Sequence, residues 1–380
     1  MEPTTGLLWS KYDFSAIPFD RVVKVGQRSL LHRDLFTVSW LLGRFCNYRC
    51  SYCWPHGRSD QKDHRPLPLL IRTLDEIKRQ SRDRGYHSFH ISFSGGEPTL
   101  HPGYLDLLRY YSADTPNCPY QSVHMTTNLS AGLPFWDKYL SAVSALHRVS
   151  VTASWHREAG EKDPSGHAER FASKLVFLQS HDVQATINMV MVPRWFDLLW
   201  SEALYFHERG LNVTLKPQSD PSASHVLSDY TPEQLSRLHN GLPQRDFTRA
   251  RLNAEKRAER RPQPKTPMPG KNPASASEEE LVPQVMQIEL TDDQGKTWYM
   301  DQAERFNAFH FNRFEGWLCE SGYRSMIIRE PDGSVKRSYS CHDEPLGNIE
   351  TGFRLFDAPR KCITPTCVSS ADSKIPKCRN

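Results

Sequence analysis

Three cysteines stand close together in the first part of the sequence, at Cys46, Cys50 and Cys53, with the spacing C-x3-C-x2-C. An iron–sulfur cubane has four irons, which are usually held by four thiolates. Three local cysteines leave one iron without a protein ligand, and an open coordination position is what a catalytic metal needs. The alternative is a zinc site that a distant residue, such as His56, completes.

A second group of cysteines lies in the last part of the sequence, at Cys319, Cys341, Cys362, Cys367 and Cys378. Of the nine cysteines in the chain, only Cys118 stands alone, and a lone cysteine is most often a small buried hydrophobe. The start of the chain lacks the charged and apolar segments of a signal peptide, so a cytoplasmic location is expected. Disulfides are rare in a reducing cytosol, and the two cysteine groups therefore predict two metal centres.

The composition is typical of a soluble globular protein with loop-rich stretches, since 38% of residues are apolar and 27 are prolines. There is no run of about 18 apolar residues, so no membrane span is expected. The net charge of +4 does not require a nucleic-acid partner. The stretch 245–265 is locally basic; a solvated helix and linker is the favoured interpretation, and a nucleic-acid-binding patch is the alternative.

Extended and helical patterns alternate from residue 35 to residue 217. Strands are predicted at 35–42, 88–94, 121–127, 148–154, 183–192 and 211–217. Helices are predicted between them at 67–84, 103–112, 134–147, 168–181 and 194–210. This α/β alternation implies right-handed crossovers and a parallel sheet. The units are too few for a complete eight-stranded barrel, which leaves an open, partial barrel or a doubly wound sheet.

The alternation ends after residue 220. Thr231 as N-cap, Pro232 at the first position and Gln234 at the third predict a helix, whose charged pattern continues to about Arg261. Residues 262–283 are rich in proline, serine and charge, as is typical of a linker. Hairpins are predicted at 285–300 and 323–341, with their turns at 293–295 and 331–333.

A second motif directly follows the second predicted strand, where residues 93–102 read FSGGEPTLHP. The CxxxCxxC run after the first strand and this Gly-Gly-Glu motif together resemble the radical S-adenosylmethionine (SAM) superfamily. The resemblance implies a partial (β/α)6 TIM-like barrel, in which the open iron of a [4Fe-4S] cluster chelates SAM. It also implies that one electron, from an external donor of flavodoxin or ferredoxin type, cleaves SAM to methionine and a 5′-deoxyadenosyl radical, which abstracts hydrogen from an unactivated carbon.

The resemblance assigns cofactor contacts to residues near the two motifs. Gly95 and Gly96 are expected to let the backbone approach the methionine part of SAM closely. Glu97 is expected to offer its carboxylate to the ammonium group of SAM. Tyr52, just before the last cysteine of the run, is expected to line the adenine.

Further contacts are expected at the ends of later strands, because parallel barrels place functional groups there. Asn128 and Ser154 are expected to meet the ribose and carboxylate of SAM, and His156 to bind the cofactor or face the substrate. A helix cap, a strand-end hydrogen bond and a packed imidazole are the respective structural alternatives. Lys216, which ends the sixth strand, is a weaker candidate for substrate contact.

The carboxyl-terminal cysteines and the hairpin among them resemble the auxiliary-cluster modules of the superfamily, called twitch and SPASM. The full SPASM pattern has more cysteines than the five found here, so the shorter twitch arrangement with one auxiliary [4Fe-4S] cluster is favoured. The expected ligands are Cys319, Cys341, Cys362 and either Cys367 or Cys378. A zinc ribbon is the alternative.

Four segments are therefore predicted: an N-terminal arm (1–37), a radical SAM partial barrel (38–220), a helical, linker and hairpin segment (221–315), and a small twitch-like iron–sulfur domain of hairpins and helix (316–380). The expected activity is hydrogen abstraction from a small biosynthetic substrate, giving dehydrogenation, epimerisation or rearrangement by an oxidoreductase or isomerase. The auxiliary cluster is expected to transfer electrons or bind substrate. The alternatives are a maturase of ribosomally made peptides, a nucleobase-modifying enzyme and a non-enzymatic metal-binding interaction protein.

Overall fold

The computed structural model describes residues 17–27, 34–53, 58–62, 64–220, 226–243, 288–300, 311–329, 332–341, 345–367 and 369–379. His56, the basic stretch 245–265 and the predicted linker 262–283 lie outside these described residues, so the structure does not bear on them. Among the described residues, no helix is both long and apolar enough to span a membrane.

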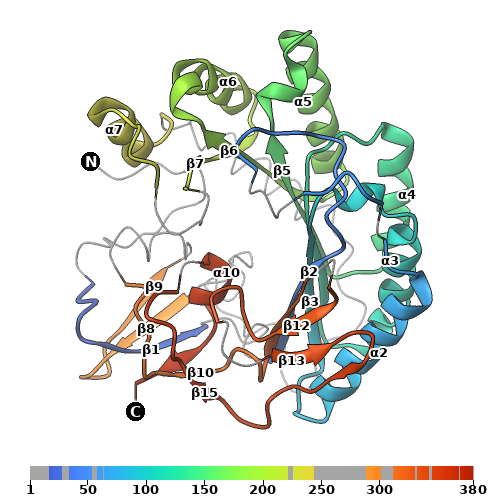
Figure 1. Ribbon diagram of the computed structural model, residues 1–380, viewed down its shortest axis with the longest axis vertical. Coiled ribbons are helices and arrows are strands. Elements are labelled where there is room, and N and C mark those ends of the chain that lie inside the picture. The colour runs from blue at the N-terminus through green and yellow to red at the C-terminus, as the bar shows by residue number, and fades with distance from the viewer. Residues whose placement is uncertain are drawn as a thin grey trace, which may run out of the picture.

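The alternation predicted for residues 35–217 is confirmed element by element. The strands are β2 (Leu35–Leu41), β3 (Ser88–Ser94), β4 (Gln121–Thr127), β5 (Arg148–Trp155), β6 (Gln184–Met191) and β7 (Asn212–Pro217). The helices between them are α2 (Leu67–Arg82), α3 (Tyr104–Ala113), α4 (Leu133–Val143), α5 (Pro164–Ser180) and α6 (Phe196–Glu208). The strands are parallel and lie side by side in chain order, and the helices cover the outer face of the curved sheet (Figure 1).

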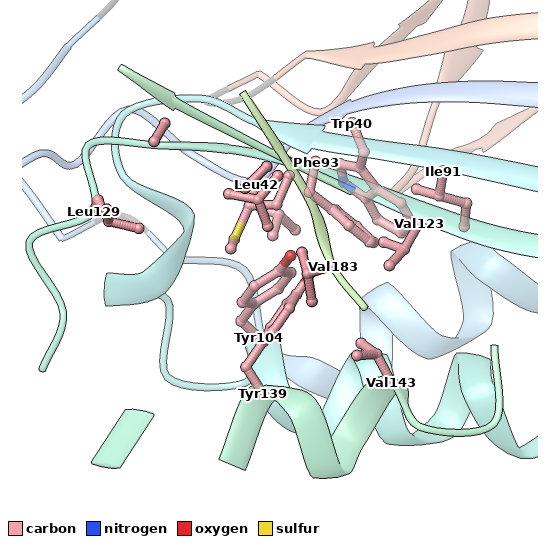
Figure 2. Close-up of a cluster of buried hydrophobic side chains, with 14 of the residues drawn as sticks. Trp40, Leu42, Ile91, Phe93, Tyr104, Val123, Leu129, Tyr139, Val143 and Val183 are labelled. Atoms are coloured by element: carbon pink, nitrogen blue, oxygen red, sulfur yellow. The ribbon is translucent and has the colours of Figure 1, made fainter. Parts of the chain in front are cut away.

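Alternate residues of each strand point to the helices and form the main core. Trp40 on β2, Phe93 on β3 and Tyr104 on α3 are fully buried, and Figure 2 shows them packed together with Tyr139 of α4. The Trp40 and Phe93 ring centroids are 5.8 Å apart, and those of Phe93 and Tyr104 are 5.3 Å apart. This apolar layer between sheet and helices fixes the positions of the strand ends.

The other alternate positions form what we call the concave face, and they are mostly polar. Its members, read from the strand register, are Leu35, Thr37, Ser39, Leu41, Ser88, His90, Ser92, Ser94, Ser122, His124, Thr126, Arg148, Ser150, Thr152, Ser154, Gln184, Thr186, Asn188, Val190, Asn212, Thr214 and Lys216. Hydrogen bonds of 2.9 Å join His90 Nδ1 to Ser122 Oγ and His124 Nδ1 to Ser150 Oγ across neighbouring strands.

The predicted second hairpin is confirmed, and it extends this sheet. Strand β11 (Ser325–Arg329) lies parallel to β2. Next to it follow β12 (Ser334–Lys336), β13 (Pro345–Asn348) and β14 (Gly352–Phe353), each antiparallel to the strand before it. Among the described residues this gives a sheet of ten strands with β14 and β7 at its edges. The sheet is therefore open, and its first strand in the chain lies in its interior.

A second sheet of six strands joins distant segments of the chain in the order β15 (Arg360–Lys361), β10 (Leu318–Cys319), β16 (Lys377–Cys378), β1 (Val22–Gln27), β8 (Ile288–Asp292) and β9 (Thr297–Met300). The predicted hairpin within 285–300 is confirmed as β8 and β9, with Gly295 at φ +79° in its turn. The pairings cross the predicted segment boundaries, because β1 of the arm lies between β8 and β16.

The remaining helices among the described residues are short. Helix α7 (Pro232–Asn240) begins with the predicted capping box of Thr231 and Gln234. It ends at Asn240, because Gly241 follows with φ +70°, a backbone conformation that terminates a helix. The prediction of a continuous helix to Arg261 is therefore wrong. The others are α10 (Ser370–Ser373) and the 3₁₀ turns η2 (Pro98–Leu100), η3 (Thr115–Asn117), η4 (Arg157–Gly160) and η5 (Pro193–Trp195).

Helix α2 fastens the loop after β14 to the barrel. The buried Gln80 side chain donates to the Phe353 carbonyl and accepts from the Leu355 amide, both at 2.8 Å. Arg84 donates to the Leu355 carbonyl at 2.7 Å and to the Phe356 carbonyl at 2.9 Å. These side chains satisfy backbone groups at the end of β14 and in the loop that follows it.

Candidate functional site

The loop that carries Cys46, Cys50 and Cys53 leaves the end of β2 and packs on the Gly-Gly-Glu segment at the end of β3. The Gly96 amide donates to the Gly43 carbonyl, and the Glu97 amide donates to the Phe45 carbonyl, both at 2.8 Å. A Cβ atom on Gly95 would overlap the Gly43 carbonyl, and one on Gly96 would overlap the Phe45 carbonyl. The glycines therefore permit backbone contact with the cysteine loop, a role that the sequence does not reveal.

Glu97 is buried, with 3% of its surface exposed. One carboxylate oxygen accepts from the Thr99 hydroxyl at 2.8 Å and the Thr127 hydroxyl at 2.7 Å, and the other accepts from the Asn128 amide at 2.6 Å. Burial raises the pKa of Glu97, and these hydrogen bonds oppose the rise. Glu97 thus ties the end of β4 to the cysteine loop, and its contact with the ammonium group of SAM stays a prediction.

Asn128 lies at the end of β4 beside the cysteine loop. Its side-chain amide nitrogen is 3.7 Å from Cys46 Sγ and donates to Asn47 Oδ1 at 2.9 Å. Its side-chain oxygen accepts from the Ser130 amide at 2.9 Å. The prediction for Asn128 did not include Asn47, whose place between two cysteines of the run is the only sequence signal for it.

His156 follows β5 and touches the same loop from the other side. Its Nδ1 lies 3.1 Å from Cys50 Sγ and 2.7 Å from the Tyr52 hydroxyl. Burial lowers the pKa of His156 to about 4, so the ring is neutral at pH 7. The Tyr52 ring lies nearly parallel to it at 21°, and the Tyr48 ring meets it edge-on. The structure therefore brings two predicted site residues, Tyr52 and His156, together.

Glu158, in the turn after His156, holds the tip of the cysteine loop, and sequence reasoning missed it. Its carboxylate accepts from the Ser51 amide at 2.6 Å and from the Ser51 hydroxyl. Arg194 lies 3.5 Å from Glu158 and donates to the Ser51 hydroxyl at 3.0 Å. The charged residues Arg157 and Glu158 directly after a predicted strand end are the signal that could have found it.

Ser154 lies on the concave face, opposite Asn188.

The three thiols of the loop are free. Burial raises the pKa of Cys46 and raises that of Cys50 to about 12, so both are protonated at pH 7 when no metal is bound. Among the described residues, no three His, Cys, Asp or Glu side chains are grouped to hold a single metal ion. Three cysteines on one loop, with Asn128 and His156 beside two of the sulfurs, are a donor set that fits a thiolate-held iron–sulfur cluster.

Four of the carboxyl-terminal cysteines are buried, and Cys341 and Cys319 each interact with Cys362; the four are Cys319, Cys341, Cys362 and Cys367. A hydrogen bond between Cys362 and Cys341 lowers the pKa of Cys341 and raises that of Cys362. Burial raises the pKa of Cys367 to about 12, and the nearby Cys319 contributes to the rise. Unpaired thiols gathered in this way fit a second cluster by the chemistry of the donor set.

Cys378 does not join this group. It lies opposite Leu318 in the pairing of β10 with β16, whereas Cys319 lies opposite Lys377. Residues opposite one another share a face and successive residues alternate, so Cys378 and Cys319 point to opposite faces of the sheet. The geometry therefore favours Cys367 over Cys378 as the fourth cysteine of a cluster site. Lys377, which sequence reasoning missed, is buried near Cys367, and its ammonium donates to the carbonyls of Asp372, Ser373 and Ile375.

Comparison with known families bears on the first of these sites. The model of the Radical SAM superfamily matches residues 40–197. This segment is similar to the radical SAM superfamily. The radical SAM segment begins on β2, contains the cysteine loop, the Gly-Gly-Glu motif, Asn128 and His156, and ends in α6. It does not include the four buried carboxyl-terminal cysteines.

Two curated relatives match part of the chain. The chain is 34% identical over 83 residues to the GTP 3′,8-cyclase of Actinobacillus pleuropneumoniae serotype 5b, covering 22% of this chain and 23% of the relative. It is 27% identical over 204 residues to the GTP 3′,8-cyclase of Stenotrophomonas maltophilia, covering 50% of this chain and 59% of the relative. The chain thus spans less than two thirds of the length of these relatives.

Solved structures of similar fold include Streptococcus suis SuiB bound to its precursor peptide SuiA. That match has a TM-score of 0.46 and 14% identity and covers 83% of this chain and 63% of SuiB. Native anSMEcpe with bound AdoMet matches with a TM-score of 0.47 and 15% identity, covering 83% of this chain and 79% of that chain.

Proposed function

We propose that this protein is a radical SAM enzyme with a partial (β/α)6 barrel, in which Cys46, Cys50 and Cys53 hold a [4Fe-4S] cluster that binds SAM. One observation carries the proposal. The three free cysteines lie on a loop that is bonded to the Gly-Gly-Glu segment, and Asn128 and His156 reach two of the sulfurs from neighbouring strand ends. A structural turn does not need polar groups directed at its thiols.

The residues around the loop have distinct tasks in this proposal. When bound, the cluster and SAM supply the carbon radical that abstracts hydrogen. The backbone bonds to Gly96 and Glu97 hold the loop against β3, and Glu158 holds its tip. Asn128 and the neutral His156 place hydrogen-bonding groups at Cys46 and Cys50. Because the free thiols are protonated, loading the site releases protons.

We assign one auxiliary [4Fe-4S] cluster to Cys319, Cys341, Cys362 and Cys367, within a twitch-like arrangement. Mutual proximity and burial of these thiols support the assignment. The buried Lys377 ammonium near Cys367 offsets the negative charge of thiolates. Such a cluster transfers an electron to or from the substrate side, or binds substrate, and an external donor of flavodoxin or ferredoxin type reduces the enzyme.

The proposed substrate is a small biosynthetic molecule, and the reaction a dehydrogenation, epimerisation or rearrangement. The compared proteins suggest two more specific reactions. GTP 3′,8-cyclases match part of the chain, which supports cyclisation of a small molecule as one form of rearrangement. A structure named for its precursor peptide, SuiB with SuiA, makes peptide modification the second candidate.

Anaerobic reconstitution followed by a cleavage assay tests the proposal. With dithionite as reductant, the protein is expected to convert SAM to methionine and 5′-deoxyadenosine. A variant in which Cys46, Cys50 and Cys53 are all alanine is expected to lose this activity, whereas Cys118→Ala, at a buried site within the hydrophobic core, retains it. Iron and sulfide near zero in the wild-type protein, with no SAM cleavage, would falsify the enzyme proposal.

The auxiliary cluster is tested by counting iron in the same triple variant. About four irons per chain are expected to remain, because one cubane cluster is untouched. Adding Cys367→Ser is expected to remove most of this iron, whereas adding Cys378→Ser leaves it in place. Equal loss in both variants would contradict the assignment of Cys367 as the fourth ligand.

A further inference from the structure

The concave face next to the proposed SAM site consists of hydroxyl, amide and imidazole groups with few apolar side chains. On β2 to β7, its only charged members are Arg148 and Lys216, and none of its members is an aspartate or glutamate. An apolar ligand would leave these polar groups without hydrogen bonds, which is unfavourable. The face therefore favours a polar ligand and offers no anionic group to repel a negative charge.

Lys216 lies at the end of the sheet where the proposed SAM site lies. It is opposite Val190 near the carboxyl end of β7, as the cysteine loop, the Gly-Gly-Glu segment and His156 follow the carboxyl ends of β2, β3 and β5. No hydrogen bond or ion pair joins its ammonium group to another residue that the structure describes. A half-buried lysine in this position has its charge available for a ligand.

A second cation reaches the concave face from the carboxyl-terminal segment. Lys374 caps α10, which lies on the concave side of the sheet in Figure 1. Tyr339, also from the carboxyl-terminal part of the chain, interacts with Ser39 and Ser94 on the concave face of β2 and β3. Burial lowers the pKa of His124 to about 4, and the nearby Lys374, Arg148 and Lys216 lower it too. His124 is therefore neutral at pH 7 and adds a hydrogen-bonding group without charge.

We propose that the substrate is a small anion, with a phosphate or carboxylate group that lies between Lys216 of the barrel and Lys374 of the carboxyl-terminal segment. The proposal rests on the proposed function, because it takes the concave face as the substrate side of the SAM site. Both lysines lie close enough to His124 to affect its pKa, and an anion between them would accept a charge-assisted hydrogen bond from each ammonium group. The serine, threonine and histidine side chains then bind the uncharged polar part of the molecule.

Calorimetric titration of the reconstituted protein with inorganic pyrophosphate and, separately, citrate tests this inference. At low ionic strength at least one of the two anions is expected to bind, and the tighter one identifies phosphate or carboxylate as the preferred group. Lys216→Gln and Lys374→Gln are each expected to weaken binding at least about tenfold, since a charge-assisted bond contributes that much. Lys374→Arg keeps the charge and is expected to retain binding.

Lys138→Gln is the matched control, because Lys138 is an exposed lysine on α4, the helix that covers the opposite face. It is expected to bind the anions as the wild-type protein does. Unfolding midpoints without ligand show whether the lysine variants are folded. The inference is wrong if neither anion binds, or if the folded double variant binds both as tightly as the wild-type protein.

The titration needs no SAM cleavage, so the two proposals fail separately. Lysine-dependent anion binding by a protein that does not cleave SAM would refute the proposed function and leave the anion site standing. SAM cleavage together with lysine-independent binding would refute the anion site alone.

Discussion

Replacing Gly96 by alanine tests whether the glycine pair exists to hold the cysteine loop against β3. The added Cβ would overlap the carbonyl oxygens of Arg44 and Phe45, which belong to the backbone and cannot rotate away. The loop must then move, and the two 2.8 Å backbone bonds from Gly96 and Glu97 to it are lost or weakened. Two such bonds contribute about 0.5–1.5 kcal/mol each, and overpacking costs about 1–3 kcal/mol. The free energy of unfolding is therefore expected to fall by about 2–6 kcal/mol.

Urea unfolding of the protein without iron measures this change, and the rate of thiol modification at Cys46 and Cys50 reports on the loop itself. Gly132→Ala is the control, because its Cβ would meet only the Pro134 ring, at 3.6 Å. That variant is expected to stay within about 1 kcal/mol of the wild-type protein, the usual size of an N-cap change. If Gly96→Ala unfolds with the wild-type free energy and its thiols react no faster, the overlap is accommodated without moving the loop and the reasoning is wrong.

Three further predictions concern other parts of the molecule. The pKa of His124 is lowered to about 4 in the folded protein, so as the pH falls the unfolded chain binds a proton on this histidine before the folded protein does. Its contribution to stability is therefore present above about pH 6.5 and is lost between about pH 6.5 and 4. His124→Gln is expected to remove up to about 3 kcal/mol of this pH dependence of the free energy of unfolding, measured with urea, and an unchanged pH dependence would count against it. Gln80→Leu leaves the Phe353 carbonyl and Leu355 amide unpaired and is expected to lower the free energy of unfolding by about 2–4 kcal/mol, which a cost below about 1 kcal/mol would contradict. Cys118→Ala is expected to leave reconstituted iron unchanged, because Cys118 packs in the main core, and iron loss would show that it is a ligand.

The barrel strands could be predicted from the sequence because each buries alternate residues under a helix. Strand β3 has the predicted bounds, Ser88–Ser94. Helix α5 begins at Pro164, four residues before its prediction, because Asp163 accepts from the Gly166 amide and caps it. An aspartate followed by proline is a recognisable helix start, so this boundary was available in the sequence.

Pairings between distant segments could not be predicted. The sequence of residues 325–329 does not indicate that they pair with β2, because the pattern of a strand does not specify which other strand it pairs with. The choice between Cys367 and Cys378 required the pairing of β10 with β16, which decides the face that each thiol occupies. The motifs indicated several of the residues at the cysteine loop, whereas the roles of Glu158 and Asn47 required the folded geometry, because their sequence signals name no partner.

The place of β2 inside the ten-stranded sheet has a consequence for the order of assembly. One side of β2 pairs with β3, which follows soon in the chain, but the other pairs with β11, which a ribosome makes much later. Until then β2 presents an unpaired row of amides and carbonyls, the kind of edge to which other chains add. The cysteine loop leaves this strand, so its scaffold is complete only when the last part of the chain has folded. Chains cut short before β11 would expose that edge permanently and aggregate, and iron delivery is best timed after synthesis has finished.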